Sequence, residues 1–281
     1  MSTEVLRPHR FVRRVVRLVA ASLLASPVVA SNAQTTRLAT ASSIMPLEGR
    51  AKVPYNVGEE LTYSASFGVL HAGTAHMRVD GIELVRGRPA YHVVFTLDGG
   101  VPFFRVHDRY DSWIDVQTLS SLRHHQQISE GRYKRTTRYE IYPERGTYEI
   151  GDSVFQSVNH PLDDGSFIYA VRTAGIKVGE TRQDDRYFRP DRNPVVLTGL
   201  RQESVQVGAG NFEATVVKPS IKANGIFSDR GEAQVWFSDD ARRYPVLLRS
   251  KFAKFSLKLE LQSIDRGVSP EMAAAVSALQ H

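Results

Sequence analysis

The chain contains no cysteine. This absence excludes a catalytic thiol, a disulfide framework and a zinc site with cysteine ligands. It also excludes a lipid anchor attached to a cysteine behind a leader. The fold must therefore depend on its hydrophobic core alone, and a chain of 281 residues is long enough to build one.

The apolar run near the N-terminus is short. It covers residues 18–30 and is interrupted by Ser22, Ser26 and Pro27, whereas a membrane-spanning helix needs about 20 apolar residues. Five arginines precede this run and small residues follow it, which is the pattern of a secretory signal peptide over residues 1–33. Cleavage is predicted after Ala30 or Ala33, with an uncleaved N-terminal anchor as the alternative. The sequence thus predicts export to the periplasm.

A strong charge of one sign is also lacking once this leader is set aside. The whole chain has 36 basic and 30 acidic residues, and the leader holds five arginines and one glutamate. The remainder is close to neutral. A nucleic-acid-binding protein needs a retained basic patch, so no nucleic-acid partner is expected.

The rest of the chain divides into a linker, one domain and a tail. Residues 34–52 are rich in Ser, Thr and Ala and are predicted to be a disordered linker. Residues 53–265 carry the strand patterns and form a β-rich domain. Residues 266–281 form a C-terminal tail, in which residues 269–280 have a helical pattern.

Alternation of apolar and polar side chains is the main structural signal. Within residues 231–238, Ala233, Val235 and Phe237 fall on one face, and residues 255–262 alternate in the same way. This period of two predicts strands with one face on a core and one in water. Regular short strands separated by turns predict an all-β fold: curved antiparallel sheets forming a sandwich or a partly open barrel.

One short internal helix is expected in the middle of the chain. Asp163 and Ser166 are suitable N-cap residues, the apolar residues after them have helical spacing, and Gly175 ends the run. We expect this helix to divide the sheet into two halves.

The order of several landmarks resembles that of the DUF3108 family, exported bacterial proteins of unknown function. The resemblance covers most of residues 53–264. It implies an envelope location and a β-rich fold, and it supplies no catalytic residues. Its landmarks are VGEELTY (57–63), GVLHAG (68–73), Asp108 with Trp113, EG (130–131), DGSFIYAVR (164–172), VGAGNF (207–212), VWFSDD (235–240) and RRYPV (242–246).

Charged residues gather in the turn that follows residues 231–238. Asp239, Asp240, Arg242 and Arg243 could together clamp an anion or a sugar hydroxyl. The structural alternative is that the aspartates accept backbone N–H groups at a tight turn and the arginines pair with them.

A second candidate group lies in the strand-like segment 106–116. Asp108 and Arg109 are close in sequence to Trp113, and a carboxylate facing inward is costly unless it is paired. If Asp108 faces inward, an arginine partner is expected, and a buried ion pair is favoured over a catalytic acid. Trp113 and Trp236, with the many Tyr and Phe residues, could line a surface for an acyl chain or a sugar. The alternative is that they belong to the core.

Metal and cofactor chemistry is not indicated. Neighbours in a strand face opposite sides, so His124 and His125 are poorly placed to ligate one metal, and His71 and His76 lack ligand spacing. No nucleophile motif is found. We therefore predict no cofactor and leave enzymatic activity open.

Three functions remain for this sequence. The first is non-enzymatic binding of an apolar or amphipathic envelope component, a lipid or a glycan, with peripheral envelope association. The second is an envelope hydrolase or lyase that uses cleft carboxylates. The third is a scaffold of an outer-membrane assembly that works through an exposed strand edge.

Overall fold

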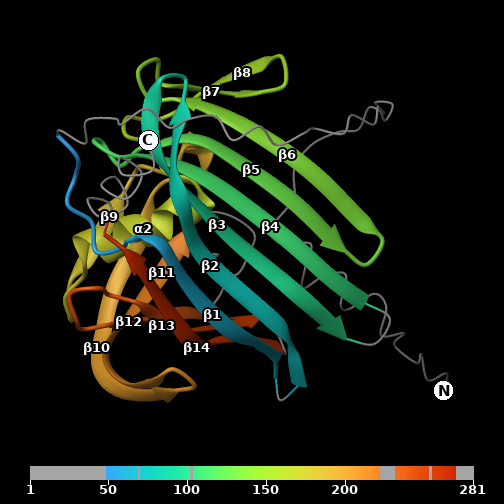
Figure 1. Cartoon of the computed structure of the whole chain (residues 1–281), viewed down its shortest axis with the longest axis vertical. Helices are drawn as coiled ribbons and strands as arrows, with labels where there is room; N and C mark the ends of the chain where they lie inside the picture. The colour runs from blue at the N-terminus through green and yellow to red at the C-terminus, as the bar shows by residue number, and fades with distance from the viewer. Residues whose placement is uncertain (1–48, 69, 102–103, 222–231, 253–254, 270–281) are drawn as a thin grey trace, which may run out of the picture.

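The structure, a computed structural model, describes residues 49–68, 70–101, 104–221, 232–252 and 255–269. The expected signal peptide, most of the expected linker and the C-terminal helix lie outside these residues. Fourteen strands and the expected helix make up the described fold (Figure 1). The strands are β1 (Val57–Phe67), β2 (Leu70–Val85), β3 (Arg88–Val101), β4 (Phe104–Asp115), β5 (Ser121–Glu130), β6 (Tyr133–Tyr142), β7 (Thr147–Ile150), β8 (Ser153–Gln156), β9 (Thr181–Asp184), β10 (Val195–Val207), β11 (Gly210–Ile221), β12 (Glu232–Ser238), β13 (Pro245–Phe252) and β14 (Phe255–Val268).

All fourteen strands belong to one antiparallel sheet, in the order β8-β7-β6-β5-β4-β3-β2-β1-β14-β13-β12-β11-β10-β9. The sheet is strongly bent and does not close into a barrel. This confirms the expected all-β class with curved antiparallel strands. The helix, which lies between β8 and β9 in the chain, does not divide the sheet, because the first and last strands pair with each other at its centre.

The helix α2 (Asp164–Ala174) begins and ends where the sequence predicts. The side chain of Asp163 accepts hydrogen bonds from the backbone N–H groups of Gly165 and Ser166, and Ser166 returns a bond to complete a capping box. Gly175 ends the helix with φ of 67°, a left-handed conformation that glycine adopts without steric cost.

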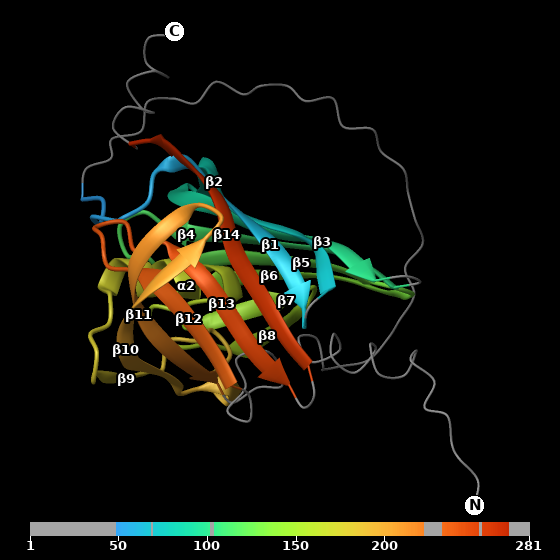
Figure 2. The same ribbon diagram turned by 90° about the horizontal axis from the view of Figure 1, so that it is seen from below.

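The concave face of the sheet is wrapped around α2 (Figures 1 and 2). Tyr169 of the helix packs in one cluster with Val79, Val93 and Ile114 from β2, β3 and β4. On another side, Arg172 forms a buried ion pair with Glu59 of β1, with Nη1 and Oε1 2.6 Å apart. The helix therefore fills one part of the concavity and is fixed there by both apolar packing and charge.

The two edges of the sheet approach each other beside the helix. Leu162, just before α2, forms a parallel bridge with Tyr187, and the backbone N–H of Phe188 donates to the Leu162 carbonyl at 2.8 Å. Tyr139 and Tyr148, from β6 and β7, pack in one cluster with Phe188. These loop contacts span the gap that the sheet itself leaves open.

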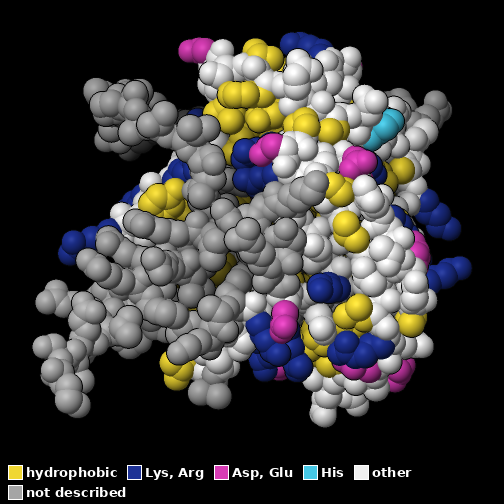
Figure 3. Space-filling view, turned by 180° about the vertical axis from the view of Figure 1, so that it is seen from behind, with side chains coloured by type: hydrophobic (Ala, Val, Ile, Leu, Met, Phe, Trp, Pro, Cys, Tyr) yellow, Lys and Arg dark blue, Asp and Glu magenta, His cyan; other side chains and the backbone are white. Residues whose placement is uncertain are grey.

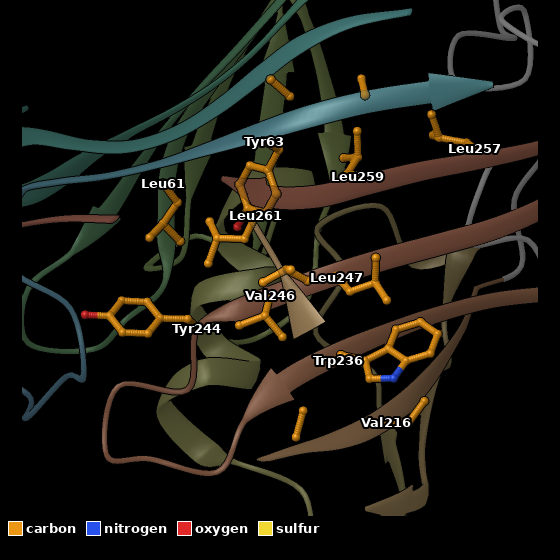
Figure 4. Close-up of a cluster of buried hydrophobic side chains, with 14 residues drawn as sticks. Leu61, Tyr63, Val216, Trp236, Tyr244, Val246, Leu247, Leu257, Leu259 and Leu261 are labelled. Atoms are coloured by element: carbon orange, nitrogen blue, oxygen red, sulfur yellow. The ribbon is translucent and has the colours of Figure 1, made fainter. Parts of the chain in front are cut away.

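The outer face of β12 and β13 is covered, which differs from the expectation of one wet face. Val235 belongs to the cluster that includes residues of α2, and the neighbouring Trp236 points to the other side yet is only 2% exposed. Figure 4 shows Trp236 beside Val216 of β11, within a cluster that also contains Val207 of β10. The β10–β11 hairpin curls back, so that the N–H of Ala209 donates to the Leu261 carbonyl of β14 at 3.0 Å.

Basic and acidic side chains lie beside one another on the face of the molecule shown in Figure 3. Several of them are ion pairs between exposed side chains, such as Arg201 with Glu203 and Lys251 with Glu232. In the described part of the chain, no helix has the length and apolar character needed to cross a membrane.

Candidate functional site

The concave face changes character along β2, β3 and β4. Beside α2, Val79, Val93 and Ile114 are buried. Farther along the same face, away from the helix, the apolar side chains are only partly buried. We call this set the open floor; it comprises Phe67 of β1, Met77 of β2, Phe95 and Leu97 of β3, and Tyr110 of β4.

Cross-strand pairing makes the open floor continuous. Met77 lies opposite Phe95, and Phe95 lies opposite Tyr110. The Phe95 and Tyr110 rings are 6.1 Å apart at their centroids, and the hydroxyl of Tyr63 contacts the sulfur of Met77 at 3.6 Å. Apolar surface that keeps contact with water costs about 25 cal/mol per Å² relative to burial, so this floor is suited to an apolar ligand.

Two buried carboxyl groups lie at the border of the open floor. Asp108 of β4 pairs across the sheet with Leu97, and Glu130 of β5 pairs with Val106. Asp108 and Glu130 are each 5% exposed and share a side-chain hydrogen bond. The Oδ1 atom of Asp108 also accepts the backbone N–H of Ser129 at 2.9 Å.

This carboxyl pair holds a proton at neutral pH. Burial raises the pKa of Asp108 above its ordinary value. Burial, followed by the charge and hydrogen bond of Asp108, raises the pKa of Glu130 to about 8. Two adjacent carboxyl groups in an apolar setting cannot both be ionised cheaply. The neutral member is a hydrogen-bond donor, which can bind a polar group of a ligand or give up its proton.

The sequence predicted an arginine partner for an inward-facing Asp108. Asp108 does face inward, but among the described residues its carboxyl is bonded to Glu130 and not to an arginine. Arg109 faces the opposite side of β4, where its guanidinium donates two hydrogen bonds to Asp111, at 2.8 and 2.6 Å. A retained proton, not a cation, therefore reduces the cost of burying Asp108.

A serine, a histidine and two aspartates meet at the N-terminus of α2. The hydroxyl of Ser112 donates to Asp163 Oδ1 at 2.6 Å and lies 3.1 Å from His124 Nδ1, while His124 Nε2 is 3.5 Å from Asp164 Oδ2. Burial lowers the pKa of His124, but the two carboxylates outweigh burial and raise it.

These groups resemble a hydrolase triad in type but not in access. Ser112, His124 and Asp163 are all 0% exposed, and the serine proton is directed to a carboxylate that already caps the helix. Such an arrangement fastens α2 to β4 and β5 and leaves no space for a substrate at the hydroxyl.

Trp113 lies on the convex face in a polar cluster of its own. Its ring stacks on His92 at 4.4 Å with an interplanar angle of 5°, and its Nε1 donates to Glu83 at 2.7 Å. His92 in turn contacts Asp111 at 2.8 Å. Burial acts to raise the pKa of Asp111, but hydrogen bonds from His92 and Arg109 outweigh it and lower the pKa to about 2.

The turn between β12 and β13 uses its charges locally. Asp240 Oδ1 accepts the backbone N–H groups of Arg242 and Arg243, at 2.7 and 3.0 Å. Asp239 accepts the hydroxyl of Thr215 at 2.7 Å and also a bond from Gln202. These contacts are those of the structural interpretation of this turn.

Two of these charged residues also reach across the fold. Arg242 donates to Asn56 at 3.1 Å, ahead of β1, and Arg243 donates to the Arg172 carbonyl at 2.9 Å, so the turn is tied to two other segments.

The structure thus brings together only some of the residues singled out in the sequence. Arg109 and Trp113 join through Asp111 and His92 on the convex face. Trp236 is buried under the β10–β11 hairpin, with its Nε1 donating to Glu203 at 2.6 Å. Asp108 stands apart from all of these, on the concave face.

The residues that sequence reasoning missed are Glu130 and the open floor itself. Glu130 follows His124, Gln126 and Ile128 at alternate positions of β5, all of them buried. An acidic residue at the inward phase of a strand was a signal that could have identified it.

Comparison with known proteins places most of the chain in one family. Residues 62–262 match the family model described as "Protein of unknown function (DUF3108)". No curated protein matches the chain.

Solved structures of other proteins share the fold at low identity. The crystal structure of a beta-barrel-like protein of the domain of unknown function DUF1849 from Brucella abortus is 10% identical, with a TM-score of 0.51, and the match covers 76% of this chain and 99% of that one. A "putative lipoprotein" from Parabacteroides distasonis is 11% identical with a TM-score of 0.35, over 76% and 98% of the two chains. At these identities the similarity to the Brucella protein concerns the fold alone.

Proposed function

This chain belongs to the DUF3108 family of proteins of unknown function, and we propose that it is an exported periplasmic protein that binds an amphipathic envelope component, a lipid or a glycan. The apolar part of the ligand lies on the open floor, and its polar part meets the pair of Asp108 and Glu130. The signal-peptide pattern of residues 1–33 supports the location.

The observation that carries this proposal is the unequal cover of one sheet face. Val93 and Leu97 are on the same strand and the same side, yet Val93 is buried against the α2 cluster and Leu97 keeps part of its surface. A core that served stability alone would be covered along its whole length. Apolar area left partly open next to polar groups is a common property of ligand sites.

The carboxyl pair adds the polar half of the site. A neutral carboxylic acid donates one hydrogen bond, and the second carboxylate accepts one or more. This combination suits a hydroxyl, an amine or a protonated phosphate at the head of an amphipathic molecule. It also accounts for the placement of two acids beside apolar side chains, which is costly for the fold by itself.

Native mass spectrometry of the protein purified from the cell envelope tests the proposal. We expect additional mass from a bound lipid or glycan in the unmodified chain, and its loss in Leu97→Arg, which puts a charge on the open floor. Thr96→Arg is the matched control, because Thr96 is the preceding residue and faces the other side of β3. A clean apo mass under mild conditions, or equal retention in both variants, counts against the proposal.

The carboxyl pair also favours a second candidate, an envelope hydrolase or lyase. An acid with a pKa near 8 can act as a general acid at neutral pH. Turnover of cell-wall or glycoside substrates that is lost in Glu130→Gln and kept in Glu149→Gln would support this function. If purified protein shows no turnover that depends on Glu130, this candidate is set aside.

A further inference from the structure

The two ends of the sheet are connected by different kinds of turn. Because every strand is antiparallel to its neighbour, the β1–β2, β3–β4, β5–β6, β11–β12 and β13–β14 connections all lie at one end. Two pairings establish this placement for the C-terminal strands: Phe67 with Leu257, and Glu232 with Lys251. Figure 1 shows the β1–β2, β3–β4 and β5–β6 connections on the same side of the molecule.

Large apolar residues flank the turns at this end. Each of three connections begins and ends with an apolar residue, and the two face each other as the last pair of the ladder. We call this side of the fold the apolar end. These pairs are Phe67 with Leu70, Val101 with Phe104, and Phe252 with Phe255. Leu70 is the most accessible of those whose side chains are described, at 60% exposed.

The opposite end of the sheet is polar. The β2–β3 turn contains Arg86 and Gly87, the β6–β7 turn contains Glu144 and Arg145, and the β12–β13 turn contains the hydrogen-bonded Asp240. Since the same strands connect both ends, a general apolar character of the strands does not explain the contrast. The apolar residues are concentrated on one side.

Positive charge surrounds the apolar end. Arg105, Arg132 and Lys134 are exposed next to the β3–β4 and β5–β6 turns, and within the described residues no carboxylate forms an ion pair with them. The acids found there are already occupied. Asp98 contacts His107, Glu232 pairs with Lys251, and the carboxyl group of Glu130 keeps its proton at neutral pH.

We propose that the apolar end adsorbs to an anionic lipid surface. The apolar residues at the turns enter the headgroup boundary, and the arginines and lysine contact the phosphates. Apolar area combined with nearby cations is the composition by which proteins bind at the interface of anionic membranes. This goes beyond the proposed function, because adsorption requires no ligand on the open floor.

The absence of cysteine permits a direct test. Leu70→Cys and Leu84→Cys each provide a single thiol for an environment-sensitive dye. The two residues lie on the same strand at opposite ends, and they are 60% and 57% exposed, so Leu84 also controls for binding through any other part of the chain. With vesicles containing phosphatidylglycerol, we expect a blue shift of the dye at residue 70 and none at residue 84. Equal shifts at both positions, or none at either, would overturn the proposal.

Vesicle flotation measures the strength of adsorption. Leu70→Glu should weaken binding about tenfold, since it removes the transfer energy of a leucine side chain and adds a like charge to the surface it meets. Leu84→Glu should have no effect, and raising the salt concentration should weaken binding of the unmodified chain. Salt-independent binding, or equal loss in both variants, contradicts an electrostatic lipid contact.

Two further outcomes separate this proposal from its alternatives. A blue shift at residue 70 that grows with protein concentration in the absence of vesicles means that the apolar end binds a second copy of this chain, and the lipid proposal then fails. Leu97→Arg should float with vesicles as the unmodified chain does. If it loses envelope-derived ligand but still floats, the two proposals stand independently.

Discussion

Arg172 of α2 and Glu59 of β1 form an ion pair that is shielded from solvent. Their side chains are 0% and 2% exposed, and two hydrogen bonds of 2.6 and 3.2 Å join them. The rings of Tyr55, Tyr169 and Tyr244 surround the guanidinium at 5.4 to 5.6 Å from its central carbon. This pair fixes the helix against the central strand and so decides how much of the concave face it covers.

Replacing Arg172 with methionine should destabilise the fold by about 3–5 kcal/mol, because it leaves the Glu59 carboxylate buried without its partner. Urea titration followed by tryptophan fluorescence measures the change. Lys251→Met is the control, since it breaks the pair of Lys251 with Glu232, whose side chains are 71% and 70% exposed; it should cost less than about 1 kcal/mol. Similar losses in the two variants would refute the role assigned to Arg172.

The carboxyl pair makes stability depend on pH. In the folded chain the pKa of Glu130 is about 8, against an ordinary value of 4.5, so the folded state retains a proton that the unfolded state releases between these pH values. Stability should therefore fall as the pH rises from about 4.5 to about 8. Glu130→Gln should remove this decline and be more stable than the unmodified chain at pH 8, by about 1 kcal/mol or more. Thermal unfolding at several pH values measures it, and an unchanged slope in the variant argues against a shared proton.

Asp111 gives the opposite dependence on the convex face. Its pKa is lowered to about 2 from an ordinary value of 3.8, so its contribution to stability is present above pH 3.8 and is lost as the pH falls toward 2. Asp111→Asn should cost about 2 kcal/mol at pH 7 and little at pH 2. Guanidinium titrations at both pH values test this, and a cost independent of pH would show that Asp111 acts through its shape and not its charge.

Trp236→Ala should destabilise the fold by about 3 kcal/mol or more, because the ring is 2% exposed and its removal leaves a cavity between β10, β11 and β12. Trp236→Phe keeps most of the volume and should cost less, although it leaves the Glu203 contact unmade. Denaturant titration distinguishes the two. A change under about 1 kcal/mol for the alanine variant would mean that the hairpin does not cover this ring.

The sequence was sufficient for the class of fold and for the helix. Alternation in β12 and β14 predicts their inward faces, and the Asp163 cap and Gly175 locate α2 to within one residue. These signals are local, since each depends on neighbours a few positions apart.

Contacts between distant segments were not predictable in the same way. The β1–β14 pairing, the cover over Trp236 and the meeting of Asp108 with Glu130 depend on how far the sheet bends, which the period of two does not specify. The candidate site suffered most, because Asp108 and Trp113 are five residues apart in sequence but lie on opposite faces of β4.

The pairing of β1 with β14 has a consequence for biogenesis. Its partners, such as Tyr63 and Leu261, lie at nearly opposite ends of the domain, whereas every other neighbouring pair of strands is consecutive in the chain. A polypeptide that emerges N-terminus first exposes one long edge of β1 until the last strand has been delivered. Its seam closes last, so the half-finished molecule must be guarded against pairing with its own copies.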